Sequence, residues 1–166
     1  DLQAVGINKV IYVTSAAEMY ESVMQKISSV DIFISAAAVS DFRVQKKSEQ
    51  KIKKSQDVKK LIIEKTPDIL CQVSELNDAP FTVGFAAETE DLELNAQKKM
   101  HLKNLDMIAA NQVGNGIGID SEENALTVFW ETGSKQLPLA SKTKLARKLI
   151  KLVASQYNEK NSNKTH

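Results

Sequence analysis

Four short apolar runs, separated by segments of helical periodicity, constrain the fold of this chain more than any other feature. The runs cover residues 10–14 (VIYVT), 31–38 (DIFISAAA), 81–87 (FTVGFAA) and 105–110 (LDMIAA). Because they are almost continuously apolar and show no alternation of period two, they are typical of strands buried on both faces of a parallel sheet. We therefore expect an α/β protein with a mostly parallel central sheet.

The intervening segments predict helices and two additions to the sheet. Apolar residues at helical spacing predict helices over residues 16–28, 67–76, 90–104 and 141–157. Ser15 is the expected N-cap of the first helix, and Thr66 followed by Pro67 is the expected start of the second. Residues 51–65 and 125–139 read as strand-like pieces joined by turns, so we expect β-hairpin additions to a Rossmann-like three-layer fold.

The length and apolar content fit one domain. Hydrophobic residues make up 42% of the 166 positions, which is enough for a sizeable core. We expect a single domain over residues 1–157. Residues 158–166 are polar and are expected to form a frayed tail.

The charge balance excludes two classes of partner. Twenty-two Lys and Arg against 21 Asp and Glu leave a net charge of +1, so no broad surface for nucleic acid or for an anionic membrane is expected.

No apolar run reaches the length of a membrane span, and we expect a cytoplasmic protein. Cys71, His101 and His166 are too few for a structural zinc site, so any metal would be a hard cation bound by oxygen.

Polar groups follow three of the predicted strands. The segments 39–43 (VSDFR), 86–89 (AAET) and 111–113 (NQV) each place polar or acidic residues after apolar ones. Open parallel sheets bind ligands beyond the carboxyl ends of their strands, which makes these segments candidate binding residues. Taken singly, each segment is better explained by ordinary turn and cap chemistry, because the same residue types are favoured there.

A cationic segment lies between the second and third apolar runs. Residues 43–65 carry nine basic and three acidic side chains, a local charge of +6. Such a segment beside a strand end is typical either of a phosphate site or of a solvated surface hairpin, and the sequence leaves both open. It contains no aromatic residue, which argues against single-stranded nucleic acid as its ligand.

Two lysines occupy an unusual place in the third predicted helix. At about 100° per residue, Lys99 and Lys103 fall within roughly 20° of Leu92, on the stripe expected to face the sheet. Lysines spaced by four repel one another unless an anion holds them together, so the pattern favours an anionic ligand. The alternative is that both stems pack on the sheet while the ammonium groups reach water.

Other motifs leave two further functions to weigh. The segment 114–118 (GNGIG) lacks the complete G-x-G-x-x-G spacing of a dinucleotide loop, which counts against a Rossmann-type oxidoreductase. A non-catalytic nucleotide-binding module would rest on the basic segment alone. No nucleophile elbow or P-loop is present, and Cys71 falls within a predicted helix, where a structural thiol is expected.

Taken together, six strings resemble one enzyme family. They are AAVSDFR (37–43), EQKIKK (49–54), KTPDIL (65–70), VGFAAET (83–89), KKMHLKNLDMIAAN (98–111) and SEENALTVFW (121–130). In order and spacing, over roughly residues 14–157, they are similar to the bacterial phosphopantothenate–cysteine ligase, also called phosphopantothenoylcysteine synthetase. In most bacteria this ligase is the C-terminal half of a bifunctional coenzyme A biosynthesis protein whose N-terminal half is a flavin-dependent decarboxylase. Nothing of a flavin domain is expected in this chain.

The resemblance implies a ligase reaction in two steps. The carboxylate of 4′-phosphopantothenate attacks the α-phosphate of CTP in the presence of Mg²⁺, which gives an acyl-cytidylate and pyrophosphate. The amine of cysteine then attacks the activated acyl carbon, which releases CMP and forms the amide. Mg²⁺ is expected to arrive on the nucleotide phosphates rather than on dedicated protein ligands.

The resemblance also implies the site residues. Lys51 is the expected catalytic residue, stabilising charge on the phosphates while the acyl-cytidylate forms. The positions expected to bind CTP are Ser35, Ala36, Ala37, Asp41, Lys51, Pro67, Asp68, Ile69, Leu70, Phe85, Lys99 and Lys103. Among these, Lys99 and Lys103 would neutralise the triphosphate, whereas Phe85 and the turn at 67–70 would shape the nucleoside pocket. Asn111 is a second-rank candidate.

One part of the family pattern has no counterpart in this sequence. The family's first strand, with its glycine-rich turn and an Asn-containing stretch that binds phosphopantothenate, is missing. The chain is therefore expected to lack part of the acyl-substrate site. The family's ligases are dimers with sites near the subunit interface, which implies a homodimer.

Overall fold

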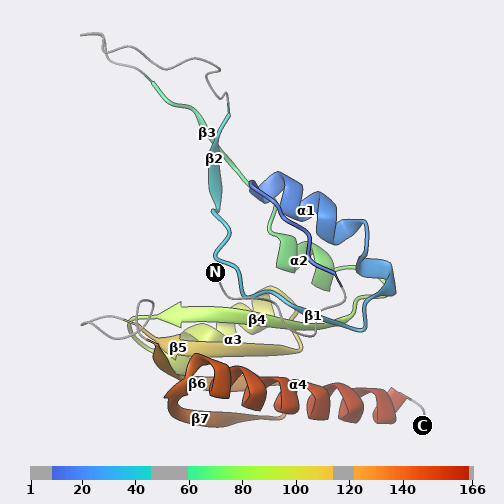
Figure 1. Ribbon diagram of the computed structural model, residues 1–166, viewed down its shortest axis with the longest axis vertical. Coiled ribbons are helices and arrows are strands. Elements are labelled where there is room, and N and C mark those ends of the chain that lie inside the picture. Colours follow the sequence, from blue (N-terminus) through green and yellow to red (C-terminus); the bar gives the residue numbers. More distant parts are fainter. Residues whose placement is uncertain (1–8, 46–59, 114–121, 165–166) are drawn as a thin grey trace.

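The protein is built on a five-stranded mixed sheet. In the computed structural model (Figure 1), which describes residues 9–45, 60–113 and 122–164, the strand order is β1-β4-β5-β6-β7. The strands are β1 (Ile32–Ile34), β4 (Phe81–Glu88), β5 (Met107–Gln112), β6 (Glu123–Trp130) and β7 (Gly133–Ser141). β1, β4 and β5 are parallel, whereas β6 and β7 continue the sheet antiparallel. The expected α/β class with parallel core strands is confirmed.

Helices cover both faces of this sheet. They are α1 (Ala16–Met24), the 3₁₀ turn η1 (Ile27–Ser29), α2 (Ile69–Ser74), α3 (Leu92–Leu102) and α4 (Lys142–Lys164). Leu145, Leu149 and Val153 of α4 pack with Val83 and Met107 on one face. The other face carries α2 and α3, with α1 packed on α2. The three layers of Figure 1 follow from this division.

The core strands are buried on both faces, as the apolar runs predict. Val83 and Met107 are fully buried toward α4, and Ile108 is 2% exposed toward α3. Gly84 follows Val83 in β4 and is paired with Ile108 of β5. A Cβ atom at this position would come within 2.7 Å of Leu105 Cδ1 and 3.0 Å of Leu70 Cδ2. A glycine at this position lets Leu70 of α2 and Leu105, which precedes β5, pack closely on β4.

A second, two-stranded sheet stands apart from the main one. β2 (Phe42–Val44) and β3 (Ile63–Lys65) pair antiparallel, with Phe42 opposite Lys65, and Arg43 bonds Glu64 at 2.7 Å. Figure 1 shows this hairpin projecting away from the five-stranded sheet. The hairpin predicted within residues 51–65 thus pairs one of its strands with residues 42–44; residues 51–59 lie outside the described part of the chain.

One predicted strand is absent from the described structure. Residues 10–14 form no strand, and Val10, Ile11 and Tyr12 are 49%, 43% and 92% exposed. A strand needs a neighbour for its backbone N–H and C=O groups, and none of the strands in the described residues pairs with this segment. β1 is likewise shorter than the run at 31–38, because its last hydrogen bond to β4 is Ser35 N–H to Val83 O, at 2.9 Å.

All four predicted helices are present, but their boundaries differ from prediction, and the helix predicted over residues 16–28 ends at Met24. Ser15 caps α1 as expected, accepting the N–H of Glu18 at 3.2 Å, but α2 begins at Ile69 with Asp68 as its N-cap rather than Thr66. The Asp68 carboxylate accepts the N–H of Cys71 at 3.1 Å, a stronger cap than a threonine hydroxyl already engaged elsewhere. The tail predicted to fray is instead helical as far as residue 164, as part of α4.

The hairpin predicted over residues 125–139 is present as β6 and β7. Its tight turn lies at Glu131 and Thr132, between the paired residues Trp130 and Gly133. The pair extends the main sheet antiparallel and gives α4 a surface to pack on. Among the helices described, none is both long and apolar enough to cross a membrane.

Candidate functional site

The carboxyl ends of the parallel strands gather the candidate residues at one edge of the sheet. Ser35, Ala36 and Ala37 follow β1 directly, while Glu88 ends β4 and Asn111 lies near the end of β5. The register of Ala87 with Asn111 places the ends of β4 and β5 side by side. Ile34, the last residue of β1, lies opposite Val83, so β1 ends earlier along the sheet than β4 does. This is the edge at which open α/β sheets bind ligands.

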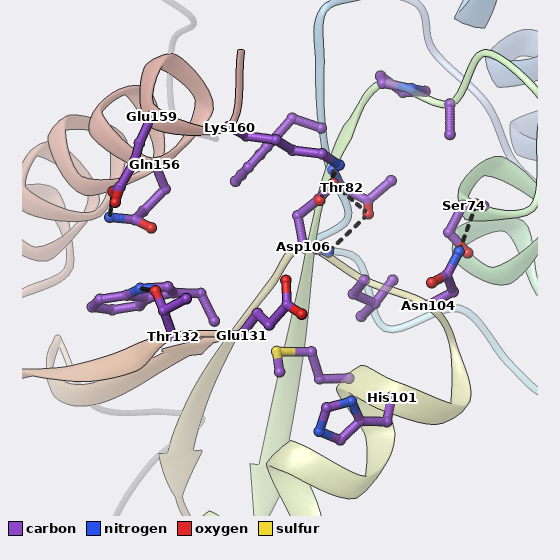
Figure 2. Close-up of a pocket in the computed structure, with 16 residues that line it drawn as sticks. Ser74, Thr82, His101, Asn104, Asp106, Glu131, Thr132, Gln156, Glu159 and Lys160 are labelled. Carbon is purple, nitrogen blue, oxygen red and sulfur yellow. Dashed lines mark hydrogen bonds and ion pairs between the residues drawn. The ribbon is translucent and has the colours of Figure 1, made fainter. Parts of the chain in front are cut away.

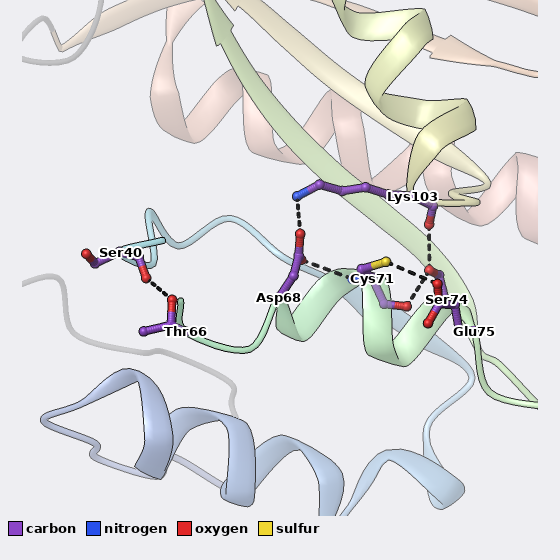
Figure 3. Close-up of polar contacts among 7 residues, drawn as sticks. All are labelled: Ser40, Thr66, Asp68, Cys71, Ser74, Glu75 and Lys103. Atoms are coloured by element: carbon purple, nitrogen blue, oxygen red, sulfur yellow. Dashed lines mark hydrogen bonds and ion pairs between the residues drawn. The ribbon is translucent and has the colours of Figure 1, made fainter. Parts of the chain in front are cut away.

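Two residues predicted to bind the nucleotide are in contact. Lys103, the C-cap of α3, places its Nζ 2.7 Å from Oδ2 of Asp68, the N-cap of α2 (Figure 3). The main chain fixes the same junction, because Ser74 Oγ at the end of α2 donates to the carbonyl of Lys103 at 2.5 Å. The α2–α3 junction therefore presents a paired ammonium and carboxylate.

The charge of Lys103 acts on the titration of Asp68. Burial alone would raise the pKa of Asp68, but the hydrogen bond and charge of Lys103, with the N–H groups of Cys71 and Leu70, hold that pKa below its ordinary value. The carboxylate is therefore ionised at neutral pH.

The second predicted lysine is held in the same way. Lys99 Nζ lies 2.6 Å from Oε1 of Glu88, whose side chain is 12% exposed. Glu88 is the last residue of β4, so its carboxylate projects at the carboxyl edge of the sheet. Each of the two lysines expected to meet phosphate is thus matched to one carboxylate of a neighbouring element.

The lysines do not occupy the sheet-facing stripe of α3, contrary to the sequence prediction. Ala96 and Met100 are the buried residues of this helix, whereas the side chain of Lys99 is 48% exposed. Lys99 lies beside that stripe, and Lys103 lies beyond the helical turns at the C-cap, where the helical angle no longer sets its direction. Their side chains extend instead to Glu88 at the end of β4 and to Asp68 at the start of α2.

The chain at Asp41 lies beside the start of α2. The N–H of Thr66 donates to the carbonyl of Asp41 at 2.9 Å, and the Thr66 hydroxyl donates to the carbonyl of Ser40 (Figure 3). These bonds bring the predicted residue Asp41 next to the predicted turn of Pro67, Asp68, Ile69 and Leu70. Ile69 and Leu70 are both buried beneath that turn. Leu70 packs toward the sheet, whereas Ile69 packs in the cluster that α2 forms with α1.

Phe85 and Asn111 fall on the opposite face of the sheet from the lysines. Alternation along β4 places Phe85 on the face of Val83, which packs toward α4, and alternation along β5 places Asn111 on the face of Ala109. Phe85 is 38% exposed, so it lies within reach of a ligand that extends around the sheet edge. The structure therefore does not bring these two residues together with Lys99 and Lys103.

The predicted catalytic residue, Lys51, lies outside the described residues. So does most of the basic segment at 43–65, of which only residues 43–45 and 60–65 are described. Within that part, Arg43 is paired with Glu64 across the β2–β3 hairpin. The glycine-rich segment at 114–118 is also outside the described chain.

A separate cavity of about 580 Å³ lies at the other edge of the sheet. It opens beside the amino ends of β4 and β5, and none of the predicted nucleotide residues lines it. Figure 2 shows Asp106 at its centre, where one carboxylate oxygen accepts the N–H of Thr82 at 2.8 Å and the other contacts Lys160. His101, which also lines the cavity, is exposed. Asp106 thus joins β4, β5 and α4 structurally.

Glu88 belongs to the strand-end segment 86–89 that the sequence marked as a candidate, but the sequence pattern assigned it no partner and no place among the nucleotide-binding residues. Its signal was present, because an acidic residue directly after the small residues Ala86 and Ala87 marks a strand end. What the sequence did not reveal is that this carboxylate faces Lys99. Across the described residues there is no group of three or more His, Cys, Asp or Glu side chains placed to hold a metal ion.

The chain is similar to a known family along most of its length. A family model described as the DNA/pantothenate metabolism flavoprotein C-terminal domain matches residues 2–157. The coenzyme A biosynthesis bifunctional protein CoaBC of Vibrio cholerae serotype O1 is 51% identical over 156 residues, covering 92% of this chain and 39% of that protein. CoaBC of Escherichia coli K12 is 40% identical over 158 residues, with coverages of 92% and 39%. The chain thus spans about two fifths of the length of these curated relatives.

Solved structures share the fold. The crystal structure of the C-terminal domain of CoaBC superposes with a TM-score of 0.70 at 33% identity, covering 90% of this chain and 66% of that one. The DNA/pantothenate metabolism flavoprotein from Streptococcus pneumoniae gives a TM-score of 0.68 at 18% identity, covering 86% of this chain and 71% of that one. The second likeness shows a common architecture alone.

Proposed function

The chain belongs to the family of the DNA/pantothenate metabolism flavoprotein C-terminal domain, and on that premise we propose that it is the phosphopantothenate–cysteine ligase domain of coenzyme A biosynthesis. The proposed domain covers residues 1–157, with α4 continuing beyond it. The proposed substrates are CTP, 4′-phosphopantothenate and cysteine.

The proposed reaction activates a carboxylate that is otherwise a poor electrophile. The carboxylate oxygen of 4′-phosphopantothenate bonds to the α-phosphorus of CTP as the bond to pyrophosphate breaks. The cysteine nitrogen then bonds to the acyl carbon, loses a proton and displaces CMP. Bringing a carboxylate to a triphosphate requires cations that are already in place, because their reorganisation would otherwise add to the barrier.

One observation carries the proposal: Asp68 and Lys103, which the family pattern assigns to the nucleotide, meet at 2.7 Å from different elements. Lys99 lies one helical turn before Lys103 and reaches the carboxyl edge of the sheet through Glu88. The two ammonium groups thus line the α3 side of the strand ends, where a triphosphate would lie. Lys51 would add its charge there while the acyl-cytidylate forms.

The described residues do not fit a dedicated magnesium cage. Octahedral Mg²⁺ needs several oxygen ligands, and no group of three acidic or imidazole side chains is found among them. Asp68 and Glu88 are each engaged by a lysine. We therefore propose that Mg²⁺ enters on the phosphates of the nucleotide, with the protein supplying lysines around it.

We further propose that the ligase is a homodimer joined through the β2–β3 hairpin. This projecting hairpin exposes large apolar side chains that the described chain leaves uncovered: Phe42 (50%), Val44 (40%), Leu61 (67%), Ile62 (65%) and Ile63 (59%). Contiguous exposed apolar surface of this kind marks interaction sites. Light scattering would show a dimer for the wild type and a shift toward monomer for Ile62→Glu.

The proposed function is tested by nucleotide-dependent pyrophosphate release. In the intact protein the release should require CTP and 4′-phosphopantothenate together, and Lys51→Gln should abolish it while leaving CTP binding measurable. Lys60→Gln is the matched control, because it removes one charge from the same basic segment. Equal, salt-sensitive binding of CTP, ATP and random RNA would instead indicate a non-catalytic polyanion-binding module.

A further inference from the structure

A carboxylate stands at the carboxyl end of β4 and holds one of the proposed phosphate-binding lysines. Glu88 is the last residue of β4, and its side chain is 12% exposed. Its Oε1 lies 2.6 Å from Lys99 Nζ, within the range of a charge-assisted hydrogen bond. The two residues join the end of a strand to the face of the helix that follows it.

The backbone on both sides of this contact is fixed. Glu88 is paired with Gln112 of β5, and its carbonyl accepts the N–H of Val113 at 2.9 Å. At the start of α3, the N–H of Asn95 donates to the carbonyl of Asp91 at 2.9 Å, and Asn95 Nδ2 donates to the carbonyl of Glu90 at 3.0 Å. The Glu88 carboxylate therefore sits at a set place relative to α3.

Burial decides which partner positions the other. A nearly buried carboxylate is costly without a cation, so Glu88 retains Lys99 strongly. Lys99 is 48% exposed, and an ammonium group has three donors, so the bond to Glu88 leaves others for an anion arriving from solvent. Asp68, at 45% exposed, holds Lys103 in a wetter contact.

We propose that Glu88 is a positioning residue that fixes the Lys99 ammonium at the carboxyl edge of the sheet for the nucleotide triphosphate. The proposal rests on the proposed function, in which Lys99 binds that triphosphate. A free lysine side chain loses conformational entropy when it binds a ligand. The contact with Glu88 already orders the side chain of Lys99, so less entropy is lost when the nucleotide binds.

The contact itself is tested without nucleotide. Competitive acetylation of the wild-type chain, read by mass spectrometry, should label Lys99 more slowly than its exposed neighbour Lys98. Glu88→Gln should raise the labelling rate of Lys99 about fivefold and leave Lys98 unchanged. Glu93→Gln is the matched control, because Glu93 lies in the first turn of the same helix and bonds Gln97 at 3.2 Å. Unchanged labelling of Lys99 in Glu88→Gln would overturn the proposal.

The role toward the nucleotide is tested by a double-mutant cycle. In calorimetric titrations with Mg²⁺ and CTP, Glu88→Gln should weaken binding about fivefold in the wild-type background. In the Lys99→Met background, the same change should leave binding equal or tighter, because the carboxylate then only repels phosphate. Thermal unfolding of each variant identifies any that fails to fold. If Glu88→Gln fails to fold in the Lys99→Met background, Glu88→Ala is used there in its place.

The outcomes separate the two proposals. Equal weakening by Glu88→Gln with and without Lys99 would contradict a role through that lysine, and tighter binding in the wild-type background would make Glu88 a competitor of the phosphates. If the wild type bound no CTP while the labelling of Lys99 still responded to Glu88, the proposed function would fail and the contact would stand.

Discussion

Lys103 Nζ lies 2.7 Å from Asp68 Oδ2, and this contact joins the C-cap of α3 to the N-cap of α2. Asp68 also accepts the N–H of Cys71, so one carboxylate caps a helix and orders a lysine at the same time. The free protein therefore holds Lys103 by a carboxylate that an incoming phosphate would have to share or displace.

The Asp68–Lys103 pair should make stability depend on acidity. The pKa of Asp68 is lowered in the folded protein, so its contribution is complete above the unfolded pKa and is lost as the pH falls through the folded one. Asp68→Asn keeps an N-cap acceptor and removes only the charge. At pH 7 it should lower the free energy of unfolding by less than about 1 kcal/mol, because both side chains are well exposed.

Urea unfolding measured from pH 7 to pH 3 checks this. The difference between the wild type and Asp68→Asn should shrink toward zero at the acid end, and Asp78→Asn, an exposed aspartate outside the pair, serves as the control. A difference that grew on acidification would contradict the assigned sign.

Any side chain introduced at Gly84 should lower the stability of the folded protein. A Cβ atom there would meet Leu105 Cδ1 at 2.7 Å and Leu70 Cδ2 at 3.0 Å, and both leucines are buried. Gly84→Val should destabilise the protein by about 1–3 kcal/mol through overpacking, and Gly84→Ala by less, because leucine ends can shift. Denaturant midpoints of Gly84→Ala, Leu105→Ala and the double variant test this, with a double cost smaller than the sum expected.

Asp106 should matter for stability more than its partner Lys160. One oxygen of Asp106 accepts the N–H of Thr82, a residue 1% exposed, so Asp106→Ala leaves a buried donor unsatisfied. We expect a loss of about 1–3 kcal/mol. Lys160→Met removes the partly exposed ion pair and the contact of the ammonium group with the ring of Phe81, and should cost under about 1 kcal/mol. Equal losses in thermal unfolding would show that the pair, and not the buried N–H, sets the effect.

Cys71 should react slowly with alkylating reagents. Burial raises the pKa of its thiol, and so does Glu75, whose carboxylate lies 3.4 Å from the sulfur. The thiolate is the reactive form, so at pH 8 iodoacetamide should modify the folded protein more slowly than glutathione. Because this is the chain's single cysteine, total thiol loss reports it directly. Glu75→Gln should speed the reaction severalfold, and a folded-protein rate above that of glutathione would contradict the prediction.

The apolar pattern predicted correctly the strands that are buried on both faces of the sheet. It failed for a segment that has no neighbouring strand to pair with among the described residues. Runs such as 81–87 are apolar on both faces, so their pattern alone indicates buried parallel strands. Residues 10–14 have the same pattern but no strand beside them in the described chain, and pattern cannot supply a partner. Likewise, the helical spacing suggested that Lys99 and Lys103 face the sheet, but the buried residues of α3 are Ala96 and Met100.

For the candidate site, residue types and their spacing were enough to indicate the polar groups at the strand ends and the lysines of α3. The partners of these residues became known from the three-dimensional arrangement: Lys103 pairs with Asp68, and Lys99 pairs with Glu88. The same arrangement places Phe85 on the other face of the sheet. The physical reason is that chemical identity and periodicity are local, whereas an ion pair needs two elements placed to within a few tenths of an ångström. That placement comes from the packing of α2 and α3 on β4 around Gly84.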